Sequence, residues 1–391
     1  MIYTLGGRDR EVSRPPLRNS VDGSHVVITG GAGFVGCNLA ARLMSAGRPV
    51  VIFDNISRAG VRANVAWLRE RFGRGFDLQI ADVRDRDAVF ASVYGASAVF
   101  HLAAQVAVTS SLADPVEDFS INAVGTLNVL EALRAQAESP PLIYTSTNKV
   151  YGDLEDLSLK RTNRRYEPVD PCIAIAGIGE GRPLDFHGPY GCSKGTADQY
   201  VHDYSRSYDM RTVVFRMSCI YGPHQYGNED QGWLAHFLIS AMRGQPIMIY
   251  GDGRQVRDAL FVEDLVDALL LAERDIDSIS GEVFNLGGGP ANTISLIELL
   301  ERIEELTGER PDVAMHGWRM GDQRYYVSDN AKFGAATGWS PTVDLETGLA
   351  RMHEWLTRVI ESDDVATIGR GPAPARTRAV SNSGFAADRA P

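Results

Sequence analysis

The stretch HVVITGGAGFVG, residues 25–36, decides the fold of this chain of 391 residues. A short β-branched run is followed by Gly30, Gly33 and Gly36 and then by the amphipathic segment 34–46. A strand, a glycine turn and a helix in this order are typical of a dinucleotide-binding unit. The first glycine permits a tight turn, the second lets a pyrophosphate approach the backbone, and the third lets the helix pack closely on the sheet. The helix N-terminus then offers amide N–H groups to phosphate oxygens.

The same alternation of short β-branched runs with longer amphipathic segments continues along the chain. It predicts strands at 25–30, 49–54, 76–82, 98–104, 141–147 and 211–218, and helices at 34–46, 61–72, 85–94, 118–137, 191–208, 263–273 and 295–307. Such alternation indicates βαβ units, and hence a parallel sheet with helices on both faces. We therefore expect an α/β fold: a Rossmann-type doubly wound parallel sheet with a smaller C-terminal substrate-binding lobe.

Four parts are expected along the chain. They are a flexible N-terminal extension (1–24), a dinucleotide-binding domain (25–220) with an insert (153–187), a region that is mainly the substrate-binding lobe (221–362), and a disordered tail (363–391). The boundary near residue 220 rests on a change from regular alternation to loops with Gly, Pro and aromatic residues. The two ends are polar or rich in Ala, Arg, Pro and Ser, which are compositions that do not form a packed core.

The overall composition excludes several classes of partner. A formal net charge of -11 and a sequence pI near 5.3 argue against nucleic acid, because phosphate binding shows as clustered Lys and Arg. No stretch approaches the roughly 20 apolar residues of a membrane helix. The four cysteines, Cys37, Cys172, Cys192 and Cys219, lack metal-ligand spacing, and no secretory signal is present. We expect a cytoplasmic protein with reduced thiols, no nucleic-acid partner and no membrane partner.

The second and third expected strands end in acidic residues. Asp54 closes PVVIFD, and a carboxylate there can accept hydrogen bonds from an adenosine ribose and repel a 2'-phosphate. This residue favours NAD over NADP. Asp82 and Val83 follow the third strand, where an adenine could be held, although Asp82 could equally be a helix cap.

Tyr190 and Lys194 stand four residues apart at the start of an expected helix. This spacing places both side chains on one face of the helix. A lysine ammonium near a phenol favours the phenolate and moves a pKa of about 10 toward working pH, so that Tyr190 could be a general base. The same spacing also occurs on solvated helix faces, and the nucleotide site upstream favours the catalytic interpretation.

Taken together, these motifs resemble the extended short-chain dehydrogenase/reductase family, and within it the NAD-dependent sugar-nucleotide epimerases and dehydratases. The resemblance covers roughly residues 25–360 and rests on TGGAGFVG, HLAA at 101–104, VYG at 150–152, Tyr190-x-x-x-Lys194, YGP at 221–223 and GDGRQVRDALFVEDL at 251–265. It implies bound NAD, a nucleoside-diphosphate sugar as substrate, and a homodimer formed through the helices around 118–137 and 191–208.

The resemblance also implies roles for single residues. Thr147 would hydrogen-bond the reacting sugar hydroxyl while Tyr190 moves the proton, and Lys194 would bind the nicotinamide ribose. Asn122 matches a family asparagine, with a helix-surface position as the alternative. The expected NAD-binding set is Gly30, Gly33, Phe34, Val35, Gly36, Asp54, Asn55, Asp82, Val83, Ala103, Ala104, Asn122, Tyr190 and Lys194.

Asn148 and Lys149 follow Thr147 at the two places where the similar dehydratases carry an acidic pair. Neither residue can be a carboxylic general acid, which disfavours elimination of water across C5 and C6 of a hexose. The related decarboxylases keep a Glu at the second place, so Lys149 disfavours them too. Redox epimerisation remains, and it requires no metal, because oxidising an alcohol needs only the base, an oxygen partner and the nicotinamide.

The segment STNKVYGD, the long insert and EDQGW at 229–233 resemble the subgroup that inverts C2 of CDP-linked deoxyhexoses. A 4-epimerase of a UDP-hexose would use the same Tyr190, Thr147 and Lys194 and remains an alternative. A non-catalytic nucleotide sensor is the alternative from another class. The intact catalytic residues argue against a sensor.

Further residues are candidates for holding the sugar nucleotide. The resemblance suggests Arg257 and Arg319 as partners of its pyrophosphate, since a guanidinium meets phosphate oxygens bidentately, with a salt bridge as the alternative for each. Trp233 could line the pocket or simply pack, and His187 is a weaker candidate for a sugar contact. The expected substrate-binding set is Asn148, Lys149, Gln231, Arg257 and Arg319.

Overall fold

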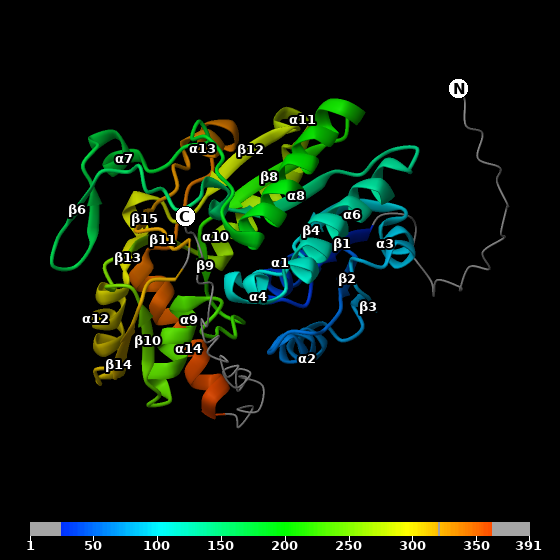
Figure 1. The fold of residues 1–391 in the computed structure, drawn as a ribbon. Coiled ribbons are helices and arrows are strands. Elements are labelled where there is room, and N and C mark those ends of the chain that lie inside the picture. Colours follow the sequence, from blue (N-terminus) through cyan, green and yellow to red (C-terminus); the bar gives the residue numbers. More distant parts are fainter. Residues whose placement is uncertain (1–24, 320, 362–391) are drawn as a thin grey trace, which may run out of the picture.

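The computed structural model describes residues 25–319 and 321–361 (Figure 1). The expected N-terminal extension and the expected C-terminal tail lie outside the described residues. Within the described ranges, no helix combines the length and the apolar composition needed to cross a membrane.

A parallel sheet of seven strands forms the centre of the larger domain. Its strands are β1 (His25–Thr29), β2 (Val50–Asp54), β3 (Phe76–Ile80), β4 (Ala96–His101), β5 (Leu142–Thr147), β8 (Thr212–Met217) and β12 (Glu282–Leu286). They lie in the order β12-β8-β5-β4-β1-β2-β3. The chain leaves β1 toward β2 and β3 and then returns to β4 on the other side. A reversal of this kind opens a crevice at the carboxyl ends of the strands.

Helices cover both faces of this sheet, as expected for a doubly wound fold (Figure 1). One face carries α1 (Phe34–Ser45), α2 (Val61–Phe72), α10 (Val262–Arg274), α11 (Ile276–Ile279) and α13 (Ala331–Thr337), and the other carries α3 (Arg86–Val93), α6 (Gly125–Arg134) and α8 (Gly188–Tyr208). Successive side chains of a strand point to opposite faces. Accordingly Val26 and Ile28 of β1 join one apolar cluster while Val27 joins the other.

The smaller lobe has its own apolar core. It contains β9 (Cys219–Tyr221), β10 (Ile247–Tyr250), β11 (Val256–Phe261), β13 (Thr293–Ser295), β14 (Val313–His316), β15 (Tyr325–Tyr326), α9 (Trp233–Met242), α12 (Leu296–Thr307) and α14 (Leu345–Glu361). Buried side chains such as Leu238, Ile249, Phe261, Ile303 and Met352 join its helices to its strands.

The boundary expected at residue 220 is wrong in one respect. The chain after this point first contributes to the smaller lobe, but α10, α11 and β12 then return to the larger domain. β12 forms the edge of the seven-stranded sheet by pairing with β8. The short run EVFNL was not among the expected strands, because the alternation gives way to loops with Gly, Pro and aromatic residues after residue 220.

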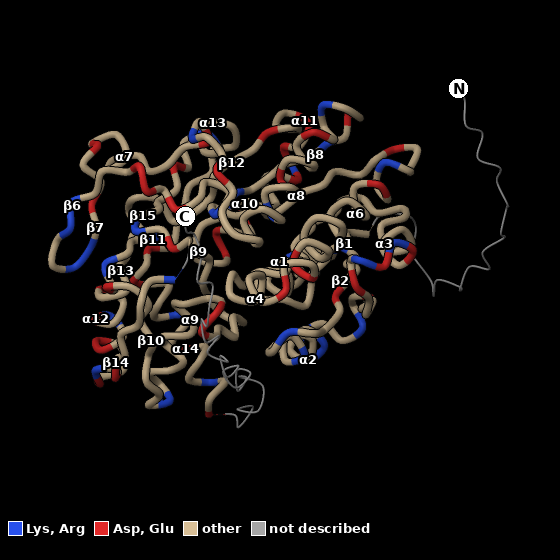
Figure 2. Tube along the Cα trace, in the orientation of Figure 1, with Lys and Arg blue, Asp and Glu red and all other residues tan. Residues whose placement is uncertain are grey.

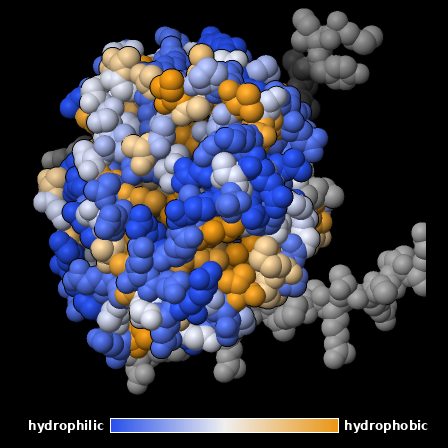
Figure 3. Space-filling model, turned by 90° about the vertical axis from the view of Figure 1, so that its left-hand side faces the viewer, coloured by the Kyte–Doolittle hydropathy of each residue, from blue (hydrophilic) through white to orange (hydrophobic). Residues whose placement is uncertain are grey.

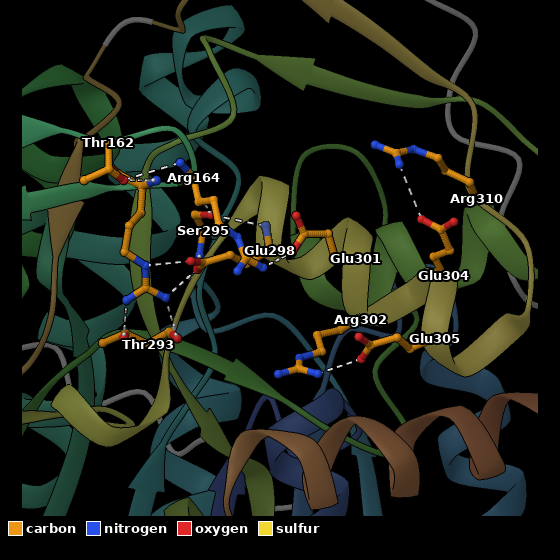
Figure 4. A network of polar contacts seen from close by, with 11 residues as sticks. Thr162, Arg164, Thr293, Ser295, Glu298, Glu301, Arg302, Glu304, Glu305 and Arg310 are labelled. Atoms are coloured by element: carbon orange, nitrogen blue, oxygen red, sulfur yellow. Dashed lines mark hydrogen bonds and ion pairs between the residues drawn. The ribbon is translucent and has the colours of Figure 1, made fainter.

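The insert contains the hairpin β6 (Leu159–Arg161) and β7 (Tyr166–Pro168) and the helix α7 (Pro171–Ala176). The hairpin docks on the smaller lobe, although it interrupts the larger domain in the sequence. Arg165 pairs with Glu298 at the start of α12, with Nε to Oε1 at 2.8 Å. The surrounding polar contacts are drawn in Figure 4. Figure 2 shows basic residues at the tip of the hairpin. Figure 3 shows that the face on this side of the molecule is mainly hydrophilic.

A buried ion pair links α8 to the sheet. Asp198 of α8 is fully buried, and Arg216 of β8 donates Nε and Nη2 hydrogen bonds of 2.9 and 2.8 Å to its two carboxylate oxygens. Arg216 also donates to the Tyr151 hydroxyl at 3.1 Å, and this hydroxyl donates to Asn285 Oδ1 of β12 at 2.7 Å. The network therefore joins the helix, two strands and the turn after β5.

We predict that Asp198→Ala lowers the free energy of unfolding by about 3–5 kcal/mol, because the arginine would be left buried and unpaired. Urea unfolding of the purified variant measures the change. Asp203→Ala removes an exposed carboxylate from the same helix and should change stability by less than about 0.5 kcal/mol. Equal effects of the two substitutions would show that the buried pair has no special role.

Candidate active site

A cavity of about 630 Å³ lies at the carboxyl ends of β1, β2, β4 and β5, bordered by the smaller lobe. Most residues expected at the site line it. They are Gly30, Gly33, Phe34, Val35, Gly36, Asp54, Asn55, Asp82, Val83, Ala103, Ala104, Thr147, Asn148, Lys149, Tyr190, Lys194, Gln231 and Trp233. The expected residues Asn122, Arg257, Arg319 and His187 are not among the lining residues.

The glycine turn leaves backbone exposed where a phosphate would lie. Gly30 has φ of +67°, and an added Cβ would come within 2.8 Å of the Ala103 backbone nitrogen. A Cβ on Gly36 would clash with the Gly30 carbonyl. Gly33 caps α1 without a side chain, so the first amides of the helix remain free for a ligand. This cradle fits the pyrophosphate of a dinucleotide.

Asp54 is held at the end of β2 by the backbone. Its Oδ2 accepts a 3.1 Å hydrogen bond from the Ala32 amide, and Oδ1 accepts one of 2.8 Å from the Ile56 amide. Burial raises the pKa of the Asp54 carboxyl, and these two hydrogen bonds act in the opposite direction. Each oxygen keeps a second acceptor position. The carboxylate is therefore well placed for a ribose diol, as NAD requires.

Asp82 does not cap α3. The cap is Asp85, whose side chain accepts from the Ala88 amide. Instead, Arg84 binds Asp82 with two side-chain hydrogen bonds of 2.8 Å, and Asn55 donates another at 3.1 Å. The ion pair with Arg84 lowers the pKa of Asp82 to about 2. The carboxylate thus stays charged at the rim of the cavity.

Thr147, Tyr190 and Lys194 come together although they belong to two elements. Thr147 ends β5, while Tyr190 and Lys194 occupy the first two turns of α8. Tyr190 is 9% exposed and Lys194 3%, so the alternative of a solvated helix face is wrong. A hydrogen bond links the hydroxyl groups of Tyr190 and Thr147 and lowers the pKa of Tyr190.

The expected effect of Lys194 on Tyr190 is not found. Burial is the largest influence on the phenol and raises the pKa of Tyr190 to about 12. Lys194 donates from Nζ to the Thr145 carbonyl at 2.7 Å and lies 4.3 Å from the centre of the Tyr144 ring. Burial lowers its own pKa to about 7. The positive charge that lowers the Tyr190 pKa comes instead from Arg58, a lining residue that no sequence motif marked.

Asn122 lies behind the cavity wall in a π-helical turn, Ser120–Val124, between α5 (Pro115–Phe119) and α6. It is 1% exposed, so the helix-surface alternative is wrong. Its amide nitrogen donates to the Gln105 carbonyl and to Ser193 Oγ, both at 3.0 Å, and its oxygen accepts from the Gln105 amide at 2.9 Å. Asn122 therefore braces the loop after β4 against α8.

Asn148 and Lys149 fasten a segment of the smaller lobe beside the cavity. Asn148 donates to Gln323 Oε1 at 3.1 Å, and Gln323 donates to the Gly152 carbonyl at 2.6 Å. Lys149 donates from Nζ to the Gly321 carbonyl at 3.0 Å. Burial, aided by the charge of Arg257, lowers the pKa of Lys149 to about 8. No sequence motif marked Gln323.

The two arginines expected at the pyrophosphate form ion pairs in the structure. Arg257 is 8% exposed and donates to Asp322 at 2.8 Å, while Arg319 donates to Glu229 and lies 3.8 Å from the centre of the Tyr250 ring. The salt-bridge alternative therefore describes both in this structure.

The remaining candidates differ in their surroundings. Gln231 Oε1 is buried without a hydrogen-bond partner among the described residues. Trp233 lines the cavity and donates to Cys219 Sγ at 3.2 Å. His187 lies between Asp153 and Asp185, 3.1 Å from each. Within residues 25–319 and 321–361, no group of three or more His, Cys, Asp or Glu side chains could hold a metal ion.

We predict that Asp54→Ala weakens NAD binding by about 10- to 100-fold, as expected for the loss of hydrogen bonds to a charged acceptor. Calorimetric titration of the NAD-free protein with NAD measures this change. Asp77→Ala removes an exposed carboxylate from β3 and should leave the affinity unchanged. Undiminished affinity in the Asp54 variant would exclude a ribose contact.

The sequence of this chain is similar to those of known NAD-dependent enzymes. Residues 26–287 match the NAD dependent epimerase/dehydratase family. CDP-paratose 2-epimerase of Salmonella typhi is 41% identical over 341 residues, which cover 85% of this chain and 99% of that protein. dTDP-glucose 4,6-dehydratase of Neisseria meningitidis serogroup B is 31% identical, over 84% of this chain and 92% of the relative.

A solved structure shows the same fold. The complex of Thermus thermophilus UDP-glucose 4-epimerase with NAD superimposes with a TM-score of 0.70 at 29% identity, covering 85% of this chain and 99% of that one. The sheet order, the glycine cradle and the residues gathered around Tyr190 thus agree with the sequence match. The chain belongs to the NAD dependent epimerase/dehydratase family.

Proposed function

We propose that this protein is an NAD-dependent epimerase that inverts C2 of a CDP-linked deoxyhexose, converting CDP-paratose to CDP-tyvelose or acting on a close relative. The observation that carries the proposal is the composition of the strand end beside Tyr190. Thr147 is followed there by Asn148 and Lys149, which join the site to the smaller lobe. The 41% identity to a CDP-paratose 2-epimerase over nearly its whole length supports the same substrate class.

Tyr190, Thr147 and Lys194 have different roles in the proposed reaction. Tyr190 takes the proton of the sugar hydroxyl and later returns it, while its hydrogen-bond partner Thr147 holds the same oxygen. Lys194 lies one helical turn beyond Tyr190 and would bind the nicotinamide ribose. Bound NAD supplies the hydride acceptor for this chemistry. The keto sugar must present its other face before it is reduced, so the pocket has to admit two orientations of one ring.

Elimination of water is the less suitable chemistry for this site. A dehydratase of this type needs a carboxylic acid directly after Thr147, and the amide and the ammonium found there cannot replace it. A decarboxylase would lack its glutamate for the same reason. Epimerisation at C4 of a UDP-hexose uses the same catalytic residues and is the second candidate, favoured by the structural likeness to a UDP-glucose 4-epimerase.

We further propose that the protein is a cytoplasmic homodimer. Exposed apolar side chains gather on α4 (Val108–Ala113), α5, the π-helical turn and α8, namely Leu112, Val116, Phe119, Val124, Tyr200 and Tyr208. Such a surface suits a homodimer formed by these helices. Four free cysteines suit a reducing cytoplasm.

Proton NMR of the purified protein with CDP-paratose in D2O, and in parallel with UDP-glucose, tests the function. We expect conversion of the CDP sugar with its C2 hydrogen retained, because the hydride returns to the carbon from which it came. Conversion of UDP-glucose alone would establish the 4-epimerase instead. Deuterium at the inverted carbon would indicate an enolising or eliminating enzyme.

The variant Tyr190→Phe connects this conversion to the site. It should lower kcat by about 100- to 10,000-fold, the usual contribution of a general base, while bound NAD is retained. The amount of NAD released on denaturation serves as the control for binding. A variant with parental turnover would remove Tyr190 from the mechanism.

For the assembly, we predict that the protein sediments as a dimer. The double variant Val116→Glu, Phe119→Glu should sediment as a monomer, because each protomer would have to bury two unpaired carboxylates in the interface. Ile175→Glu, a matched change at an exposed apolar residue of α7, should leave the dimer intact. A monomeric parent protein would contradict the proposed assembly.

A further inference from the structure

Asp118 of α5 is a buried carboxylate that the proposed reaction does not use. It is 1% exposed, and its Oδ2 has no hydrogen-bond partner among the described residues. Its Oδ1 accepts a 3.2 Å hydrogen bond from Asn122 Nδ2. Asp198, the other buried carboxylate in this region, pairs with Arg216, whereas Asp118 forms no salt bridge with an arginine or lysine in the described part of the chain. Burial without such a pair is costly and requires a reason.

The carboxylate lies close behind the catalytic residues of α8. Asn122 donates to Asp118 and also to Ser193, the residue before Lys194. Burial raises the pKa of the Asp118 carboxyl, and the nearby Ser193 hydroxyl and the charge of Lys194 oppose this effect. The negative charge in turn raises the pKa of both Lys194 and Tyr190. Asp118 thus acts on both members of the pair without lining the cavity.

Other ionisable groups around Lys194 carry little net charge. His101 of β4 is buried, and its pKa is lowered to about 3, so it is neutral near pH 7. Tyr144 of β5 has a pKa raised far above its ordinary value by burial. Asp198 faces Lys194 from the same helix and raises its pKa more than Asp118 does, although Asp198 is also paired with Arg216. Of these two carboxylates, Asp118 is the one without a salt bridge to an arginine or lysine among the described residues.

Charged groups on opposite sides of Tyr190 shift its pKa in opposite directions. Arg58 lowers its pKa from the cavity side, and Asp118 raises it from behind. Thr147 adds the hydrogen bond already described.

We propose that Asp118 is a positioning residue that keeps Lys194 as an ammonium ion beside Tyr190 when both side chains are buried. Together with Asp198, it supplies the negative charge that a buried ammonium requires, and it leaves the lysine hydrogen bond to Thr145 intact. Lys194 then stays charged where it can meet the hydroxyl groups of a ribose. Asn122, which also donates to Ser193, holds the carboxylate in place.

The lysine content of the chain permits a direct test. Only four lysines are present, Lys149, Lys160, Lys194 and Lys332. NMR of the full chain labelled with 13C and 15N lysine, with NAD bound, follows the titration of each side chain, and the variant Lys194→Arg assigns the Lys194 signal by its loss. We expect Asp118→Asn, which keeps the shape and removes the charge, to move the Lys194 titration to lower pH.

A matched control separates this effect from a general change in charge. Asp114→Asn removes one negative charge four residues earlier, at the exposed cap of α5, and asparagine keeps the cap. It should leave the Lys194 titration in place. The signal of Lys149, whose pKa is lowered to about 8 by burial in the folded protein, shows that each variant is folded. An unchanged Lys194 titration in Asp118→Asn, or an equal shift in both variants, would overturn the proposal.

The pH dependence of turnover gives a second test, which rests on the proposed epimerase function. Asp118 raises the pKa of Tyr190, which must lose a proton, and of Lys194, which must keep one. Removal of its charge lowers both pKa values, so both limbs of the kcat/KM profile should move to lower pH in Asp118→Asn. A profile with unmoved limbs would contradict the proposal. Because the NMR titration needs no substrate, failure to convert CDP-paratose would reject the proposed function alone.

Discussion

The ion pair between Asp198 and Arg216 fixes the position of α8 relative to the sheet, and the active site depends on this position. Tyr190 and Lys194 belong to α8, whereas Thr147 belongs to β5. More than forty residues separate Thr147 from Tyr190 in the sequence. Arg216 lies on β8 directly beside Ser146 of β5, so its salt bridge to α8 ties the helix to the strand that bears the threonine. The same guanidinium reaches Tyr151, just beyond Asn148 and Lys149. One buried cation therefore positions all three parts of the site.

Burial has a second consequence, which concerns charge. Tyr190, Lys194 and Lys149 lie around one cavity, and desolvation shifts the pKa of each toward its neutral form. A pair consisting of a phenolate and an ammonium must therefore be stabilised by fixed charges nearby. Arg58 on the cavity side and Asp118 on the far side supply opposite charges for this purpose.

The sequence predicted those features that depend on local spacing. The glycine turn, the strand ending at Asp54 and the helix bearing Tyr190 and Lys194 each lie within one short segment, and all appear in the structure. Contacts between residues far apart in the sequence could not be predicted from local spacing. Gln323 meets Asn148 across 175 residues, and β12 completes the sheet from a region that resembles a loop. The sign of the shift at Tyr190 was wrong for the same reason, because burial cannot be judged from a spacing of four residues.

Asn148 and Lys149 connect the catalytic strand to the smaller lobe. In the structure both side chains reach the segment at 321–323, and that segment also carries Asp322, the partner of Arg257. A carboxylic pair at these positions would act on the sugar. An amide and an ammonium instead fasten the smaller lobe to the catalytic strand. In this chain the side chains at these two places contact the smaller lobe. A pocket fastened in this way suits a reaction whose only chemical demand, beyond moving one proton and one hydride, is that the ring be held in two orientations.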